Sequence, residues 1–265
     1  MKNLIIGFVF STIISLAAYK KNSLSESGAI AAAIMGGLMY FFGGFVATAL
    51  LIGFFVSASL LTVLNKNKKK DVAKLNEKGG RRDVFQVFAN GGVGLLFAAL
   101  FYFTKNQLFL VGCAISFGEA NADTWASEVG VLSKKLPVSI LTGKALMKGM
   151  SGGVSILGTF AALAGSTFMA VVFAISHIIE YGYDKFVIFG FIAAMVLGFF
   201  GAIIDSVLGA SIQAQYYCEE ENIITEQSLH NGKPNKLIKG FSFFNNDMIN
   251  LSSNIISSIM IFFFI

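Results

Sequence analysis

The stretch FVIFGFIAAMVLGFFGAIIDSVLGASIQAQY, residues 186–216, decides the class of fold. It carries one charged residue, Asp205, and it is long enough to cross the hydrocarbon core of a bilayer, which takes about 17–25 helical residues. The rest of the chain has the same character, because 55% of its 265 residues are hydrophobic and only 13% are charged. This composition is typical of a polytopic membrane protein and excludes an ordinary soluble domain.

Apolar runs of similar length recur along the chain, although several are short or rich in glycine. We therefore predict an all-α fold, a polytopic transmembrane helix bundle of about eight helices (range six to eight), with residues 1–265 forming a single integral membrane domain. The first run also has features of a cleavable signal peptide, but Lys20 and Lys21 follow it directly and would have to be translocated. The predicted spans are residues 4–19, 28–43, 45–64, 84–103, 107–129, 153–179, 186–216 and 247–265.

The distribution of Lys and Arg predicts the orientation of the bundle, because cytoplasmic loops are enriched in these residues. With eight helices and both termini outside, 17 of the 20 Lys and Arg residues fall on one face. The basic cluster at 66–82 is then a topogenic loop that faces lipid headgroups, with phosphate recognition as a second possibility. We expect that face to be cytoplasmic, with the loops 20–27, 65–83, 130–152 and 217–246.

The charge, cysteines and histidines exclude several function classes. The net charge of +5 does not indicate nucleic-acid binding, since the topology already accounts for the basic loops. Cys113 and Cys218 make neither a disulfide framework nor a metal site, and we interpret them as packing residues. We expect His177 and His230, the only histidines, to be interfacial and solvated, which excludes a histidine metal cluster.

The segment GEANADTWASE, residues 118–128, places acids inside an apolar span. On a helix, Glu119 and Asp123 share one face at i and i+4, whereas Glu128 falls about 140° away from Asp123 and is expected at the helix end or against another helix. The two carboxylates repel each other unless a cation lies between them, and Mg²⁺ is the natural choice because it prefers oxygen ligands. Asn121 adds an amide and favours a metal and phosphate site over a proton relay or a structural pair with an Arg.

A polar stripe opens the span that follows the basic loop, in RRDVFQVFANGGVG (81–94). Asp83, Gln86 and Asn90 lie on one helical face, and Arg82 lies at its mouth. A helix start explains Asp83, which is favourable at the positive end of the helix dipole. It does not explain the two amides, so we predict a ligand-binding stripe.

The loop LPVSILTGKALMKGMSGGVSILGT, residues 136–159, combines glycines, hydroxyls and cations before a span. Glycine-rich backbone at a helix N-terminus favours phosphate through its N–H groups and the helix dipole. The order of a Walker A loop is absent, and glycines before a membrane helix are also common packing residues. The candidate phosphate-binding residues are Lys144, Lys148, Gly152, Gly153 and Ser155.

Two further spans carry polar stripes. Asp205 lies within a seam of small residues that ends at Gln213, and a buried carboxylate there needs a metal ion or a Lys or Arg. In the last span, a row of amides and hydroxyls either binds a ligand or joins helices together, with even support for each. Its members are Asn246, Asn250, Ser253, Asn254 and Ser257, with Asp247 beside them. Because all these patches fall toward the cytoplasmic ends of their helices, we predict that they meet in one pocket.

Five segments resemble, in the same order, the signature segments of the integral membrane family that includes plant phytyl-phosphate kinase and the animal transmembrane protein nineteen (the DUF92 family). They cover nearly the whole chain, and ADTWASEVG is the most specific. One loop departs from the family pattern, since Gly149-Met150-Ser151 stands where Gly-Thr-Asn or Gly-Thr-Glu is usual. The segments are RRDVFQVFANGG (81–92), ADTWASEVG (122–130), TGKALMKGMSGGVSILG (142–158), DSVLGASIQ (205–213) and NNDMINLSS (245–253).

The resemblance implies a membrane enzyme that phosphorylates a prenyl monophosphate, of phytyl or geranylgeranyl type, to the diphosphate, in a broader group of which many members use CTP. Phosphoryl transfer needs mainly positioning and charge neutralisation, so we expect Mg²⁺ and either CTP or ATP. We assign Mg²⁺ and catalysis to Glu119, Asp123 and Asp205. The predicted substrate or nucleotide contacts are Arg82, Asp83, Gln86, Asn90, Asn121, Thr124, Glu128, Lys144, Lys148, Gly152, Gly153, Ser155, Ser206, Gln213, Asn246, Asp247 and Asn250.

Two other functions stay open from the sequence. A transporter or flippase of a phosphorylated lipid or anion also places acids and glycine-broken helices near the midplane. A CTP-dependent polyprenol or dolichol-like kinase, acting on the free alcohol, needs a base, for which Asp123 or Glu128 is a candidate. The sequence leaves the nucleotide, the chain length of the lipid and the oligomeric state undetermined.

Overall fold

The computed structural model of the protein describes residues 2–65 and 81–264, so most of the predicted loop 65–83 lies outside the described residues. Within them the fold is the predicted all-α membrane bundle. Four helices, α2, α3, α5 and α6, are long and apolar enough to cross a membrane. The helices are α1 (Lys2–Lys20), α2 (Glu26–Asn65), α3 (Val84–Thr104), α4 (Leu108–Gly130), α5 (Ile156–Tyr181), α6 (Lys185–Ser211) and α7 (Asn246–Ile259), which a 3₁₀ turn, Met260–Phe264, continues.

Helix α2 contains the two predicted spans 28–43 and 45–64, separated by a break at Gly44. Gly44 has φ 60° and ψ −147°, a backbone conformation that glycine adopts without strain. Both outer ends of α2 lie near Arg82, since Ser25 N donates to Arg82 O (3.0 Å) and Arg82 Nη1 donates to Ser59 Oγ (3.0 Å). A straight helix of 40 residues would be about 60 Å long, so the chain reverses at Gly44.

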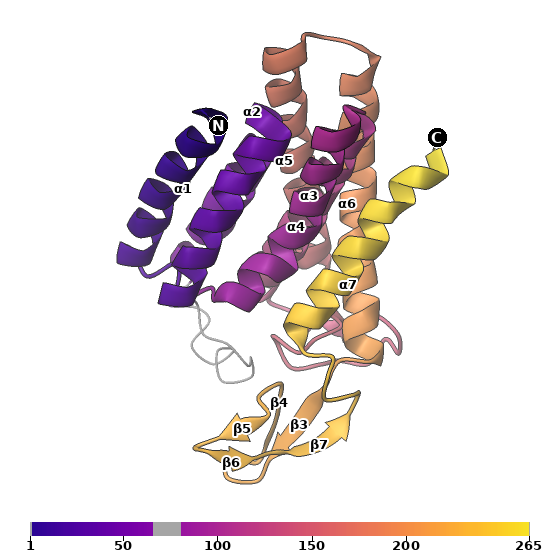
Figure 1. Cartoon of the computed structure of the whole chain (residues 1–265). Coiled ribbons are helices and arrows are strands. Elements are labelled where there is room, and N and C mark those ends of the chain that lie inside the picture. The colour runs from indigo at the N-terminus through magenta and orange to yellow at the C-terminus, as the bar shows by residue number, and fades with distance from the viewer. Residues whose placement is uncertain (1, 66–80, 265) are drawn as a thin grey trace.

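With this reversal, the eight predicted spans correspond to seven helices, of which α2 counts as two antiparallel arms. Figure 1 shows the N- and C-terminal ends at one end of the bundle and strands β3 to β7 at the other. A chain that crosses a membrane an even number of times has both ends on the same side, as these two ends are. The cytoplasmic orientation of the strand-bearing end stays a prediction.

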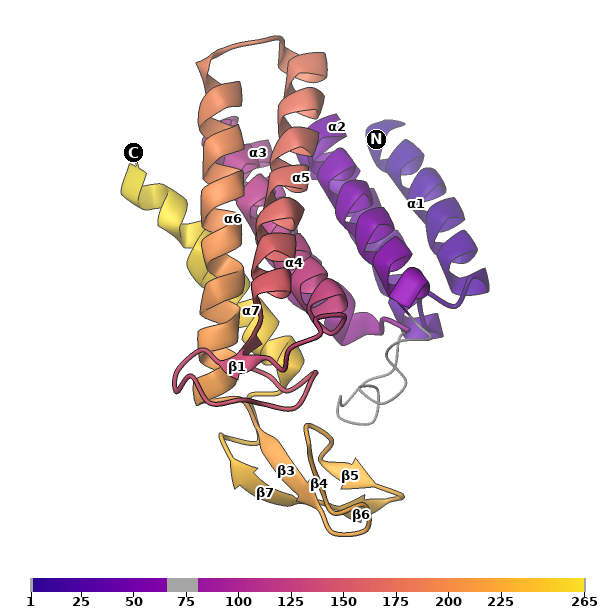
Figure 2. The ribbon, with the colours of Figure 1, turned by 180° about the vertical axis from the view of Figure 1, so that it is seen from behind.

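Small β-structures occupy two loops for which no strand was predicted. In the loop before α5, β1 (Val138–Ser139) pairs with β2 (Gly153–Val154), so α5 begins at residue 156 rather than 153. Between α6 and α7, β3 (Gln215–Cys218), β4 (Ile223–Thr225) and β7 (Lys236–Lys239) form an antiparallel sheet of order β4-β3-β7. A separate hairpin is formed by β5 (Leu229–His230) and β6 (Lys233–Pro234). Figure 2 shows the β1 loop between the bundle and the three-stranded sheet.

These strands escaped prediction because they are only two to four residues long and therefore show little alternation. The turn Asn231-Gly232, with positive φ at both residues, is the one local hairpin signal. The predicted span 186–216 is correspondingly too long, since α6 ends at Ser211 and β3 starts at Gln215.

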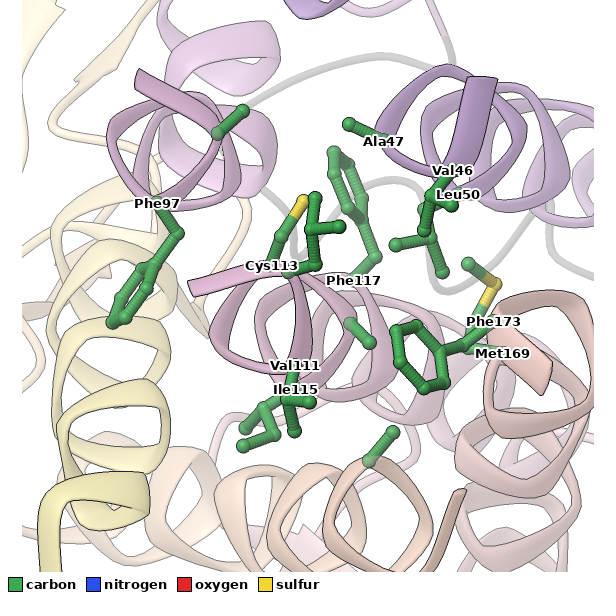
Figure 3. Packing of buried hydrophobic residues seen from close by; sticks show 14 of the residues in the cluster. Val46, Ala47, Leu50, Phe97, Val111, Cys113, Ile115, Phe117, Met169 and Phe173 are labelled. Carbon is green, nitrogen blue, oxygen red and sulfur yellow. The ribbon is translucent and has the colours of Figure 1, made fainter. Parts of the chain in front are cut away.

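Helix α4 is the centre of the bundle and packs against α2, α3, α5, α6 and α7. Its first half is apolar: Val111, Ile115 and Phe117 are fully buried, and Cys113 is a free cysteine packed among them (Figure 3). Its second half buries Glu119, which is 1% exposed. The same helix therefore supplies the apolar core and the polar site.

Candidate active site

The site lies where α4, α6 and α7 meet, and glycines allow these helices to approach closely. Gly198 of α6 lies directly on the backbone of Gly118 in α4, where an added Cβ would come within 2.8 Å of the Gly118 carbonyl carbon. One turn further along α6, Gly201 lies against the side chain of Glu119 and against Ser257 of α7. The predicted seam of small residues thus leads to an acid from each of two helices.

Helix α7 joins the two acids through one hydroxyl. Ser253 Oγ lies 2.7 Å from Glu119 Oε1 and 3.1 Å from Asp205 Oδ2. Asn254 Nδ2 donates to Glu119 Oε2 (2.8 Å) and to the carbonyl of Ser116 (3.1 Å). Both carboxylate oxygens of Glu119 are therefore held by α7.

The amide of Asn250 completes the contact between α6 and α7. In the orientation that satisfies its hydrogen bonds, its nitrogen donates to Asp205 Oδ2 (3.2 Å) and to Asn246 O (3.0 Å). The sequence analysis predicted Asn250 as a site residue. It placed Ser253 and Asn254 in the same polar stripe but left open whether that stripe binds a ligand or packs helices together. Their contacts now place them in the acidic site.

Asp123 and Asp205 complete a cluster of three carboxylates with Glu119. Asp123 lies one helical turn after Glu119, and Asp205 interacts electrostatically with both. No Lys or Arg within residues 2–65 and 81–264 pairs with any of the three. Buried like charges without a cationic partner are costly, so this cluster requires a bound cation or protons.

A fourth acid reaches this cluster from the small sheet. Glu226, which is buried directly after β4, interacts electrostatically with Asp205. The sequence analysis missed this residue. Only the pairing of β3 with β4 and β7 brings the loop back to the helix ends, so no local pattern identified it.

The residues present fit Mg²⁺ by their chemistry, since Asp123 and Asp205 offer oxygen ligands and uncompensated negative charge. Asp123 makes no hydrogen bond within the described residues, and Asp205 Oδ1 is likewise not used. Glu119 is less open, because α7 already binds both of its oxygens. Among the described residues, no three His, Cys, Asp or Glu side chains converge as a ready metal-binding group.

The opposite face of α4 carries a second polar cluster, which contains Glu128 as its angular position predicts. Thr62 Oγ1 of α2 donates to Glu128 Oε1 (2.9 Å), and Asn65 Nδ2 donates to the Glu128 carbonyl (3.0 Å). Asn121 also faces this side, accepting from Ser57 Oγ (2.8 Å) and donating to the carbonyl of Gly165 (2.9 Å). The expectation that Asn121 joins the acids was therefore wrong, since both its polar atoms join α4 to α2 and α5.

Arg82 belongs to this second cluster rather than to the acidic one. Besides its bond to Ser59, its guanidinium lies over the rings of Phe54 (5.7 Å) and Phe55 (5.8 Å) and is attracted by Glu128. Arg82 thus holds the turn before α3 against α2.

The stripe at the start of α3 is mainly a helix cap. Asp83 accepts from Gln86 N (2.9 Å), while Gln86 Oε1 accepts from Asp83 N (3.2 Å), which is a capping box. Asn90 Nδ2 donates to the Gln86 carbonyl (2.8 Å). Capping therefore explains Gln86 as well as Asp83, contrary to the sequence-based interpretation.

The glycine loop closes over the ends of α4 and α6. Lys148 Nζ donates to the carbonyls of Val131 (3.2 Å) and Ser133 (2.6 Å), so it caps α4, while Lys144 is exposed. Ser155 accepts from Gly158 N as the N-cap of α5. These contacts give Lys148 and Ser155 structural roles that the phosphate-binding prediction did not anticipate.

The centre of the same loop packs on the last turn of α6. Gly152 lies against Ala210, and Ser151 Oγ donates to Gln213 Oε1 (2.6 Å). Gln213 is 1% exposed, and its Nε2 has no partner among the described residues. Met150, at the position where the family usually carries a threonine, is buried, and Gly153 pairs with β1.

The remaining predicted residues lie at the periphery of the acidic cluster. Thr124 donates to the Ala120 carbonyl (2.8 Å), and Ser206 is half-buried beside Asp205. Asn246 is exposed at the start of α7, and Asp247 is buried in its first turn. The expectation that His177 is solvated was wrong: it is fully buried, and its Nε2 lies 3.3 Å from Gln107 Oε1.

The acidic cluster lies closer to the strand-bearing end of the bundle than to the other. Asp205 precedes the end of α6 by six residues, and Asp123 precedes the end of α4 by seven. At 1.5 Å per residue, both acids lie about 10 Å from that end. The cluster therefore lies about two helical turns from the strand-bearing end of the bundle.

Comparisons with known proteins agree with a membrane protein. Protein PGR of Arabidopsis thaliana is 35% identical over 186 residues, 65% of this chain and 64% of PGR. An uncharacterised membrane protein of Methanocaldococcus jannaschii is 34% identical over 163 residues, 62% of this chain and 67% of that protein. Protein VTE6, chloroplastic, of A. thaliana is 30% identical over 154 residues, 56% of this chain and 46% of VTE6.

The matched region thus spans less than two-thirds of PGR and less than half of VTE6. No solved structure matches this chain. A family model covers far more of it, matching residues 9–258. The protein therefore belongs to the integral membrane protein family DUF92.

Proposed function

We propose that the protein is a membrane-embedded, Mg²⁺-dependent kinase that phosphorylates a prenyl monophosphate to the diphosphate. CTP is the first candidate for the donor and ATP the second, and the acceptor is of phytyl or geranylgeranyl type. The nucleotide and the acceptor class come from the resemblance of the signature segments. The strand-bearing end of the bundle then faces the cytoplasm, as the distribution of Lys and Arg indicates.

The observation that carries this proposal is the cluster of Glu119, Asp123 and Asp205, which has no Lys or Arg partner among the described residues. Structural acids in a membrane bundle are normally paired. Unpaired acids near one end of the bundle suit a site that gains its positive charge with its ligands. A metal ion with two phosphate-bearing substrates supplies such a balance.

The chain's own residues have limited tasks in this reaction. An oxygen of the acceptor phosphate, already ionised at neutral pH, attacks the terminal phosphorus of the donor, and the bond to the bridging oxygen breaks to release the nucleoside diphosphate. No strong general base is needed, which agrees with a site without histidine. Asp123 and Asp205 would hold Mg²⁺, which when bound would neutralise charge on the phosphates.

Helix α7 positions Glu119 and Asp205. Ser253 and Asn254 fix the carboxylate of Glu119, and Asn250 and Ser253 fix that of Asp205. A carboxylate with a fixed orientation loses less entropy when it binds an ion. We therefore assign Glu119 to the support of the metal site and Asp123 with Asp205 to direct ligation.

The second candidate is a transporter of a phosphorylated lipid or anion, and one observation favours it. Beyond Glu119, three buried polar atoms on α4 and α7 have no partner among the described residues, namely Ser116 Oγ, Asn254 Oδ1 and Ser258 Oγ. They extend the polar surface deeper into the bundle, as a transport path requires. A transporter needs no nucleotide, so an assay distinguishes the two.

The test incubates purified protein in detergent with labelled CTP or ATP, Mg²⁺ and geranylgeranyl or phytyl phosphate. We expect labelled lipid diphosphate from the wild type and none from Asp123→Asn. Ser127→Ala is the control, because this exposed hydroxyl on the next turn donates only to the Thr124 carbonyl. Equal activity of Asp123→Asn, or no product with either nucleotide, contradicts the kinase proposal.

A binding measurement separates the metal site from catalysis. Mg²⁺ should raise the thermal unfolding temperature of the wild type, because an ion that binds only the folded state stabilises it. The shift should disappear in Asp123→Asn and persist in Ser127→Ala. An equal shift in all three proteins would place the ion elsewhere.

A further inference from the structure

The segment KLIKGFSFF, residues 236–244, links the sheet to α7, and we call it the interfacial segment. Four of its apolar side chains are exposed: Leu237 (41%), Ile238 (47%), Phe241 (62%) and Phe243 (68%). Leu237 and Ile238 are neighbours on β7, where the pairing with β3 shifts register, and both remain uncovered. The bundle therefore does not bury this segment.

Backbone hydrogen bonds hold the interfacial segment at the level where α6 ends. Phe241 N donates to the Ile212 carbonyl (3.1 Å), and Ala214 N donates to the Phe244 carbonyl (2.9 Å). Gly240, with φ 72°, makes the turn that presses against the backbone of Gln213. Helix α7 begins two residues after Phe244. The phenylalanines therefore lie at the boundary between apolar helices and water.

The chemistry of the segment matches the headgroup layer of a bilayer. Phe243 packs edge-on against Phe244 (5.5 Å between ring centroids), and Phe241 lies 6.5 Å from the same ring, which makes a small aromatic cluster. Lys236 and Lys239 flank the apolar residues and are exposed. Aromatic rings at the acyl boundary with lysines among the phosphates are typical of interfacial anchors.

The sheet connects this segment to the acidic site. β7 pairs with β3, β3 pairs with β4, and Glu226 directly follows β4 beside Asp205. β7 is also an edge strand, paired on one side only. Flanking lysines and a covering lipid surface protect such an edge from pairing with strands of other chains. The interfacial segment and Glu226 thus belong to the same three-stranded sheet and its adjoining loop.

We infer that the interfacial segment lies in the headgroup layer of the surrounding bilayer and binds anionic lipid phosphates through Lys236 and Lys239. The occupant is the lipid surface that adjoins α6 and α7, because the segment is continuous with these membrane helices and its charge complements that surface. The next step rests on the proposed function: the segment concentrates the anionic acceptor lipid next to Asp205.

Fluorescence quenching by brominated lipids tests the location. The chain has one tryptophan, Trp125, so a Trp125→Phe background with Phe243→Trp reports on the segment alone. The control is Glu219→Trp in the same background, since Glu219 lies in the β3–β4 turn, beyond the end of β7 that is farther from α6. In nanodiscs with brominated phosphatidylcholine we expect strong quenching at position 243 and weak quenching at 219. Equal quenching at both positions overturns the inference.

Lipid selectivity tests the role of the lysines. At the same minor fraction of brominated lipid, brominated phosphatidylglycerol should quench the Phe243→Trp reporter several-fold more than brominated phosphatidylcholine. Each lysine near an anionic surface contributes about fivefold to lipid affinity, so the selectivity should be lost in Lys236→Gln/Lys239→Gln. No selectivity in the parent protein, or selectivity unchanged in the double variant, contradicts phosphate binding. Concentration-dependent cross-linking at 243 without quenching shows a second copy of the chain instead.

An enzymatic readout then connects the segment to catalysis. In otherwise wild-type protein, Lys236→Gln/Lys239→Gln should raise the KM for geranylgeranyl phosphate in vesicles and leave kcat unchanged. Kinetics with a short, water-soluble prenyl phosphate should not change. A uniform loss with both acceptors argues against lipid delivery. The quenching experiments need no activity, so they remain informative if the kinase proposal fails.

Discussion

Helix α4 carries two polar clusters that differ in charge balance. On one face, Glu119 and Asp123 meet Asp205 without a Lys or Arg partner among the described residues. On the other face, Glu128 is attracted by Arg82 and accepts from Thr62. The second cluster is complete without a ligand and ties helices together. The first is incomplete in charge, which is the property expected of a binding site.

The largest expected difference between the clusters is in catalysis. Asp205→Asn removes a proposed ligand of Mg²⁺ and should lower kcat/KM of the kinase reaction more than about 100-fold, because the ion would supply most of the positive charge that offsets the phosphates. Glu128→Gln makes the same change from carboxylate to amide in the second cluster and should stay within about tenfold of the wild type. Comparable losses in both variants would end the distinction between the two clusters.

The second prediction concerns the close approach of α6 to α4 at the acidic cluster. Gly201→Ala places a methyl group against the Glu119 side chain and 2.8 Å from Ser257 Cβ, so the helices must move apart. We expect a loss of about 1–3 kcal/mol of stability, measured by thermal unfolding in detergent, and a loss of the Mg²⁺-dependent shift. The matched control is Gly92→Ala in α3, where an added Cβ meets only Phe88 at 3.9 Å. If both variants unfold like the wild type, the seam does not set the helix spacing.

The third prediction tests whether the second cluster is structural. A double-mutant cycle of Arg82→Met and Glu128→Gln should give a coupling free energy of about 1 kcal/mol, since their charges attract between the turn before α3 and the end of α4. The measurement is the unfolding temperature of the two single variants and the double variant. Additive effects would show that Arg82 acts through Ser59, Phe54 and Phe55 and not through Glu128.

The smallest expected effect on stability is at the exposed pair of Glu220 and Lys233. This pair shows how weakly two charges contribute when solvent screens them. A hydrogen bond from Lys233, and then one from Asn231, hold the pKa of Glu220 below its usual range, and the pair correspondingly raises the pKa of Lys233. The contribution of Glu220 is therefore present above the ordinary glutamate pKa and is lost as pH falls through the lowered value. That of Lys233 is present below the ordinary lysine pKa and is lost as pH rises through the raised value.

An NMR titration of the Glu220 carboxyl carbon checks this pair. In Lys233→Gln the pKa of Glu220 should rise toward that of a free glutamate, while the unfolding temperature changes little because exposed pairs contribute weakly. An unchanged titration curve would show that the hydrogen bond does not persist in solution. A large loss of stability would mean that this exposed pair contributes as much as the buried clusters do.

Part of the acidic site could be predicted because it depends on a single helix. The spacing of Glu119 and Asp123 places them on one face, and the 100° rotation per residue turns Glu128 away from them, as its contact with Thr62 confirms. Asp205 was identified because an acid in an apolar span is costly. The same rotation turns Asn121 about 160° away from Asp123 and toward the Glu128 face, so the expectation that Asn121 joins the acids came from its amide chemistry and not from its angle.

The sequence by itself determined the class of fold, the spans and the acids that interrupt them, because hydrophobic length and helical periodicity are local properties of the chain. Only the tertiary structure decided that Ser253 joins Glu119 to Asp205 and that Glu226, which follows β4, interacts with Asp205. These contacts join residues far apart in sequence. They depend on close helix packing and strand pairing, which no single segment encodes.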